Sequence, residues 1–143
     1  MPGGLDVIVN VEAEDVDSEA LSRAVVHAAR AEGRTAGEVS LQLLDDRGIR
    51  EMHRRYLGRD RATDVIAFSL GEDDALLGDV YIGLEQARRQ ATELGVPLGQ
   101  ELVRLAIHGT LHLLGHDHPE GEERADSPMF ELQERLVREL VEG

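Results

Sequence analysis

The amino-acid sequence predicts an α+β fold in which a small mixed β-sheet is flanked by helices. Short apolar runs alternate with segments of helical periodicity, in the order β-α-β-α-β-β-α-α-α. Two of the strand-like runs, 64–70 and 77–82, are separated only by a short acidic segment, which is typical of paired strands. The 143 residues and the 41% hydrophobic content are sufficient for one domain with its own core over residues 1–143.

Four strands are expected from alternating or β-branched apolar residues. In the first, Leu5, Val7, Val9 and Val11 would share one face. The predicted strands are residues 5–11, 39–44, 64–70 and 77–82.

Five helices are expected from apolar residues at helical spacing. Ser18 is placed to cap the first helix and Gly33 to end it. Ser127 precedes Pro128, which favours a helix start because proline suits the first helical position. Three of the predicted helices are residues 18–31, 84–94 and 98–114. A further helix is capped by Asp45 or Asp46 and ends near Gly58, and the last one begins at Pro128 and turns Leu140 inward.

Composition and charge exclude several classes of protein. The absence of cysteine rules out disulfides, thiolate metal sites and cysteine nucleophiles. No apolar run reaches the roughly 18 residues of a membrane span, and the first residues lack the pattern of a signal peptide, so we expect a cytoplasmic protein without membrane contact. A net charge of −14 argues against general affinity for nucleic acid, and we expect no DNA partner.

One basic stretch stands out from this acidic background. Six of the 15 basic residues lie between positions 47 and 61, namely Arg47, Arg50, Arg54, Arg55, Arg59 and Arg61. Guanidinium groups can bind phosphates with two parallel hydrogen bonds. The alternative is a solvated helix face whose arginines are offset by neighbouring acidic residues.

The predicted helix 98–114 carries one polar stripe on an otherwise apolar surface. Glu101, Arg104, His108 and His112 are spaced three, four and four residues apart, so they share one side of the helix. A helix that is apolar nearly all round is buried, and its polar stripe must face a cleft or contact partners. Two histidines one turn apart direct both imidazoles at one point, which is the geometry that a divalent transition metal needs.

A third histidine follows the helix. Gly115 can end the helix with a left-handed turn that brings His118 back toward His108 and His112. Three imidazoles and one open position are typical of catalytic zinc sites, and other divalent transition metals accept the same ligands. His116 is the alternative third ligand, and Asp117 is either an acceptor that orients an imidazole or a turn residue.

Two further histidines are expected to be structural, and one glycine argues against a peptidase. His27 and His53 fall on helical packing stripes, which indicates structural roles. The histidine spacing equals that of H-E-x-x-H-x-x-G-x-x-H metalloproteases, but Gly109 replaces their glutamate base. A peptidase of that type would lack its proton carrier, so peptide hydrolysis is not expected.

The segment 108–118 reads H-G-T-L-H-L-L-G-H-D-H, which closely resembles the H-G-x-L-H-L-x-G-[YH]-D-H signature of the YbeY family of rRNA maturation factors. Residues 63–68, T-D-V-I-A-F, and 77–82, L-G-D-V-Y-I, are similar to two further segments of that family. The order and the intervals agree across most of the chain.

This resemblance implies a zincin-like fold and a function. Family members are single-strand-specific, metal-dependent endoribonucleases of 16S rRNA 3′-end maturation and ribosome quality control. The resemblance implies that His108, His112 and His118 bind one Zn²⁺ per chain. The implied partners are rRNA and the small ribosomal subunit, with a ribosomal protein or an assembly GTPase as further candidates.

The sequence departs from the family at one functional position. Leu57 occupies the place of an arginine that is implicated in RNA cleavage, and Arg54, Arg55 or Arg59 could replace it because each lies within about one helical turn. Two alternatives stay open: a ribosome-assembly factor with a structural metal, and a metallohydrolase of a small-molecule or acyl substrate. The sequence also leaves open whether water or the RNA 2′-hydroxyl attacks the phosphate.

Overall fold

The computed structural model describes residues 5–11, 16–57, 65–69, 76–114 and 128–142. The elements follow one another in the predicted order. The strands are β1 (Leu5–Asn10), β2 (Gly37–Leu44), β3 (Val65–Ser69) and β4 (Leu76–Gly83). The helices are α1 (Ser18–Ala31), α2 (Asp46–Leu57), α3 (Leu84–Leu94), α4 (Leu98–Leu113) and α5 (Pro128–Glu142).

The described strands form a mixed sheet with the order β1-β2-β4-β3. The strands β1, β2 and β4 are parallel, and β3 pairs antiparallel with β4. Both the mixed sheet and the pairing of the third with the fourth strand were expected from the sequence, and the structure confirms them. The fold class is α+β, as predicted.

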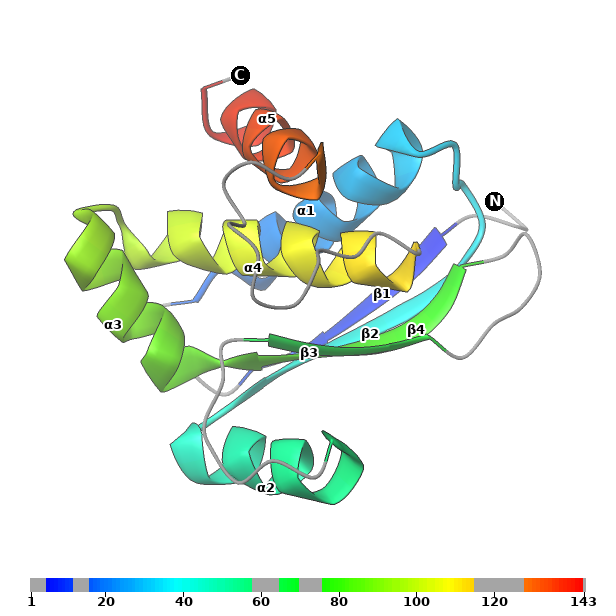
Figure 1. The fold of residues 1–143 in the computed structure, drawn as a ribbon. Coiled ribbons are helices and arrows are strands. Elements are labelled where there is room, and N and C mark those ends of the chain that lie inside the picture. Colours follow the sequence, from blue (N-terminus) through cyan, green and yellow to red (C-terminus); the bar gives the residue numbers. More distant parts are fainter. Residues whose placement is uncertain (1–4, 12–15, 58–64, 70–75, 115–127, 143) are drawn as a thin grey trace.

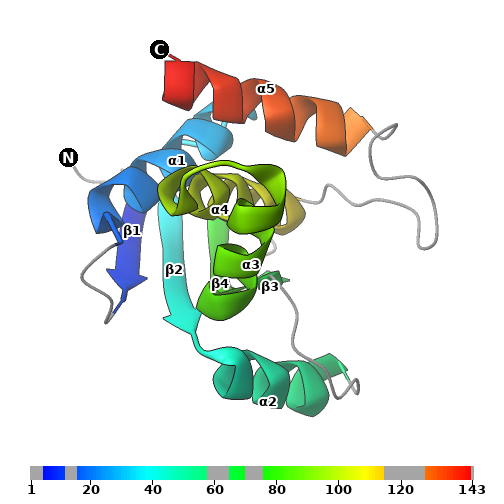
Figure 2. The ribbon, with the colours of Figure 1, turned by 90° about the vertical axis from the view of Figure 1, so that its left-hand side faces the viewer.

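Helices lie on both faces of this sheet, and their distribution is unequal. Figure 1 shows α1, α4 and α5 on one face and α2 on the other. The outermost helix is α5, which packs on both α1 and α4 (Figure 2). The core therefore lies between the sheet and α4, and it includes fully buried leucine, isoleucine and valine side chains of α1, β2, β4 and α4.

Two glycines let α4 approach the sheet closely. A Cβ atom added at Gly109 would lie 2.6 Å from Val80 Cγ1, and one added at Gly78 would lie 2.5 Å from Leu113 Cδ2. Real Cβ atoms do not approach other carbon atoms so closely, because interiors are already densely packed. Close packing of α4 on β4 thus explains why a glycine, Gly109, stands between the two histidines that are predicted to bind metal.

The start of α1 differs from the prediction by one residue. Asp17, not Ser18, caps the helix: its Oδ1 accepts hydrogen bonds from the backbone N–H groups of Glu19 at 3.0 Å and Ala20 at 3.2 Å. A cap residue needs extended backbone angles, which Asp17 has and Ser18, the first helical residue, does not. The predicted end of this helix is confirmed, since Gly33 adopts a left-handed φ of 76° just beyond Ala31.

In the part of the chain that the structure describes, none of the helices has the length and apolar character that crossing a membrane requires.

Candidate metal centre

Two imidazoles meet on the second half of α4. The Nε2 atoms of His108 and His112 lie 3.1 Å apart, and the ring planes are inclined by 68°. Two nitrogen ligands at 2.0–2.1 Å from a tetrahedral zinc ion are about 3.3 Å apart. The pair therefore already has a spacing close to that of two ligands of one metal ion.

A side chain of α5 contacts the ring nitrogen of His108 that is not directed at His112. The Nδ1 atom of His108 is 2.6 Å from the side-chain oxygen Oε1 of Gln133. An amide oxygen only accepts hydrogen bonds, so Nδ1 carries the proton of the neutral ring and Nε2 keeps its lone pair. Histidine ligands of metals commonly donate their other N–H to such an acceptor.

Gln133 is itself hydrogen-bonded to a network of charged groups. The Nε2 atom of Gln133 donates to Glu134 Oε2 at 3.0 Å. Arg104 donates to both carboxylate oxygens of Glu134, from Nε at 2.9 Å and from Nη2 at 3.1 Å. Arg104 Nη1 also donates to the buried carboxylate of Glu101. Burial alone would lower the pKa of Arg104, but its hydrogen bonds to Glu134 and Glu101 outweigh that effect and raise it.

The predicted polar stripe of this helix is thus confirmed as a stripe with partners. Arg104 and His108 of this stripe contact α5. The sequence predicts only apolar packing residues on α5, so these polar contacts were not expected. The sequence could have indicated a polar contact at Gln133, because this residue lies four residues after Met129 on the buried side of α5. A polar residue on a buried stripe needs a hydrogen-bond partner, and that requirement points to an opposite polar group.

The third ligand lies outside the described residues. His118, its alternative His116, and the intervening Asp117 all fall there, as does Gly115. Among the residues that the structure describes, no three histidine, aspartate or glutamate side chains are arranged to hold a metal ion. The geometry of His108 and His112 therefore supports two ligands, and the third stays a prediction.

The arginines predicted to bind phosphate do not lie on the same helix as the histidine pair. Arg54 and Arg55 lie in the last turn of α2, which packs on the face of the sheet opposite to α4 (Figure 1). Arg54 pairs with Glu51 at 2.6 Å, and both side chains are exposed. Arg59 lies outside the described residues. The structure thus brings His108 and His112 together and places Arg54 and Arg55 on a helix of the other face.

The other two histidines of the described chain lie where the packing interpretation puts them. His53 is buried in α2, with 5% of its surface exposed. His27 of α1 contacts Glu139 of α5, with 2.8 Å between Nε2 and Oε1. The His27 contact connects α1 to α5, and both this contact and the burial of His53 agree with structural roles.

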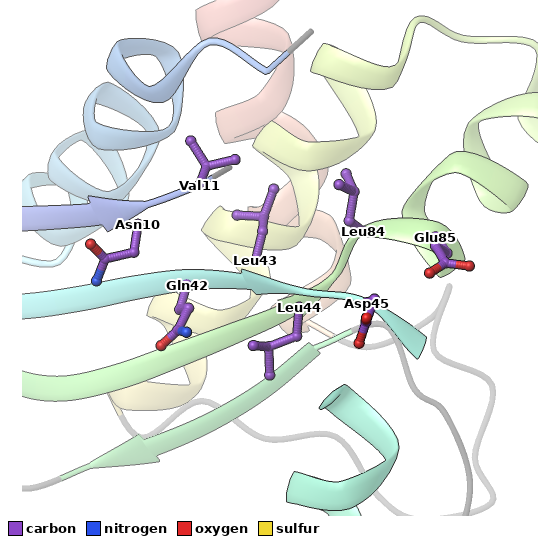
Figure 3. Close-up of a pocket in the computed structure, with 8 residues that line it drawn as sticks. All are labelled: Asn10, Val11, Gln42, Leu43, Leu44, Asp45, Leu84 and Glu85. Carbon is purple, nitrogen blue, oxygen red and sulfur yellow. The ribbon is translucent and has the colours of Figure 1, made fainter. Parts of the chain in front are cut away.

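A cavity of about 400 Å³ opens at the other end of the strands. Figure 3 shows its lining residues, which come from the ends of β1 and β2 and the start of α3. Two of its carboxylates bind the first turn of α2: Asp45 accepts from Gly48 N, and Glu85 accepts from Asp46 N. Because Gly109 lies over Val80 and the cavity begins at Leu84, beyond the carboxyl end of β4, this cavity is separate from the histidine pair.

Comparison with known proteins decides the family. A family model described as endoribonuclease YbeY matches residues 7–141. The chain belongs to the YbeY family. An endoribonuclease YbeY from Carboxydothermus hydrogenoformans is 44% identical over 131 residues, covering 88% of this chain and 90% of that protein. One from Aquifex aeolicus is 36% identical over 137 residues, covering 94% and 91%.

A solved structure supports the fold of this YbeY-family chain. The solution structure of TM1509 from Thermotoga maritima matches it with a TM-score of 0.65 and 30% sequence identity. The match covers 94% of this chain and 88% of the other. The resemblance seen in the histidine signature is therefore confirmed at the level of the family and of the fold.

Proposed function

We propose that this protein is a metal-dependent endoribonuclease that cleaves single-stranded RNA. The observation that carries the proposal is the histidine pair of α4, whose Nε2 atoms lie 3.1 Å apart within a chain of the YbeY family. In its finer form the proposal assigns the protein to 16S rRNA 3′-end maturation and ribosome quality control in the cytoplasm. Its partners there would be the small ribosomal subunit, with a ribosomal protein or an assembly GTPase.

The metal site of this proposal consists of His108, His112 and His118. The described donors fit the group, because two imidazoles converge and the Nδ1 atom of one lies against an amide oxygen, a contact that favours a lone pair on its Nε2. A zinc ion bound there would supply a Lewis acid for a phosphate oxygen and lower the pKa of a water molecule. The roles of this chain are to hold the ligands in place and to bind the substrate.

Binding of the RNA phosphates is the proposed role of Arg54, Arg55 and Arg59. Arginine forks suit phosphate oxygens and stabilise charge that develops during cleavage. Arg54 and Arg55 are exposed on α2, so RNA can reach them without any rearrangement of the core. Arg59 follows α2 in the sequence and lies outside the described residues. Arg54, Arg55 and Arg59 therefore stay alternatives for the contact nearest the cleaved phosphate.

The position of Gly109 argues against a peptide substrate. Metalloproteases with this histidine spacing need a glutamate base at that position. Here even a Cβ atom would lie 2.6 Å from the side-chain Cγ1 of Val80, so a side chain at this position would require β4 or α4 to shift.

The experiment is cleavage of a labelled single-stranded RNA by the full chain, purified free of contaminating nucleases. We expect cleavage by the wild type, loss of cleavage with a chelator, recovery on adding zinc, and no cleavage by His112→Ala. His27→Ala is the matched control, because it removes a partly exposed histidine of α1, and we expect it to cleave like the wild type.

Equal cleavage in all samples would overturn the nuclease assignment. Hydrolysis of an ester with intact RNA would favour the small-molecule hydrolase. Stoichiometric metal without any turnover would favour the assembly factor with a structural metal.

A further inference from the structure

We propose that Gln133, held in place by Glu134 and Arg104, is a positioning residue that sets the tautomer of His108 for metal binding. This inference rests on the proposed metal site, and it assigns a role to side chains of α5 that lie beyond the ligands. The residue would act through His108 and would not contact RNA.

The contact that sets the tautomer is short, and its acceptor residue is buried. The distance from Gln133 Oε1 to His108 Nδ1 is 2.6 Å, and Gln133 is only 5% exposed. Because Gln133 has little access to water, its amide oxygen would lose a hydrogen bond if the ring turned away, and leaving a buried acceptor unpaired is costly. The proton of the neutral ring therefore stays on Nδ1, and Nε2 faces His112 with its lone pair.

The same amide could in principle present its NH₂ group to His108, which would favour the opposite tautomer. Glu134 prevents this, because its carboxylate accepts hydrogen bonds only and lies 3.0 Å from Gln133 Nε2. The NH₂ group is thus turned toward Glu134, and the oxygen is turned toward the ring.

Glu134 is fixed in turn by Arg104. The guanidinium of Arg104 donates to both carboxylate oxygens of Glu134, while its remaining Nη1 donates to Glu101. A two-point contact between a guanidinium and a carboxylate restricts rotation of both groups. We call the hydrogen-bonded series Arg104–Glu134–Gln133–His108 the relay. Its first and last residues lie one turn apart on α4, and its two middle residues lie on α5.

The test measures the His108 tautomer and the zinc affinity of the full chain in four proteins: wild type, Gln133→Met, Glu134→Met and Val137→Ala. The tautomer is read from two-bond ¹H–¹⁵N spectra of the metal-free protein at a pH where the ring is neutral. Methionine keeps the length of the side chain but offers no amide or carboxylate oxygen. Val137→Ala is the control, because it loosens the packing of a buried side chain of α5 without touching the relay.

In the wild type we expect His108 as the Nδ1–H tautomer. In Gln133→Met the signal should move toward the Nε2–H form, and zinc affinity should fall about 10–100-fold, which is the usual effect of removing such a partner. Glu134→Met should move the tautomer in the same direction, although residue 134 does not touch the ring. Val137→Ala should lower the melting temperature and leave both readouts unchanged.

An unchanged tautomer in Gln133→Met would overturn the inference, and so would a shift of the same size in Val137→Ala. Zinc binding by the wild type with the same affinity in Gln133→Met would overturn the role of Gln133 and leave the proposed metal site standing. A wild type that binds no zinc would overturn both.

Discussion

Two arginine–glutamate pairs of the same spacing lie on opposite faces of the sheet. Arg104 and Glu101 on α4 have side chains that are 18% and 3% exposed, whereas Arg54 and Glu51 on α2 are 55% and 53% exposed. Both pairs join residues three positions apart on a helix, so their spacing alone does not distinguish them. Their surroundings do, because the buried pair has Glu134 as a further partner.

Buried and exposed ion pairs therefore contribute differently to the stability of this protein. A charge that is buried with its partners cannot lose one of them without leaving another unpaired, and that loss costs several kcal/mol. An exposed pair is worth little to stability, because water and salt screen it. The charges near the histidines are therefore part of the fold, while those of α2 are accessible to a ligand.

The largest effect on stability is expected for Arg104→Met. It leaves the carboxylates of Glu101 and Glu134 without their shared cation, so we expect the free energy of unfolding to fall by about 3 kcal/mol. Urea unfolding of the metal-free protein measures this. A decrease no larger than that of Arg54→Met would contradict the distinction between the two faces.

A somewhat smaller loss of stability is expected for Gly109→Ala. Alanine gains about 1 kcal/mol of helix propensity over glycine, but its Cβ would lie 2.6 Å from Val80 Cγ1 and 3.2 Å from Val65 Cγ2. Overpacking of this kind costs about 1–3 kcal/mol, so after the gain in helix propensity we expect a net loss of up to about 2 kcal/mol in the same unfolding assay. Gly99→Ala, in the first turn of α4 where a Cβ meets nothing within 4 Å, is the control, and it should not destabilise the protein. Equal behaviour of the two variants would mean that α4 does not approach β4 closely.

The sequence was sufficient to predict the order of the elements and the convergence of His108 and His112. Hydrophobic periodicity predicted the order of the strands and helices, and the spacing of His108 and His112 placed both rings on one side of α4. Those features depend on neighbours three or four residues apart, which a single sequence displays directly.

Other features depend on tertiary contacts that periodicity does not show. The partner of His108 is 25 residues away on another helix, so no local pattern paired it with Gln133. The arginine stretch likewise carried no information about the face of the sheet on which α2 packs. The cap of α1 was misplaced by one residue because Asp17 and Ser18 are both good capping residues, and only backbone angles distinguish them.

The smallest effect on stability is expected for the arginines of α2. Arg54→Met and Arg55→Met should each change the free energy of unfolding by about 0.5 kcal/mol or less, because both side chains are exposed. Their effect should fall on RNA binding instead, with a drop in affinity and a salt dependence that is shallower by about one unit for each phosphate that the variant no longer binds. Titration of single-stranded RNA at several salt concentrations measures both. Unchanged affinity and slope would show that this face does not bind RNA.

The central claim is that His108 and His112 hold one metal ion, and zinc titration of the full chain with elemental analysis tests it most directly. We predict one zinc per chain for the wild type and for His27→Ala, and loss of that stoichiometric ion in both His108→Ala and His112→Ala. A wild type without stoichiometric metal, or a His112→Ala protein that binds zinc as tightly as the wild type, would contradict the account.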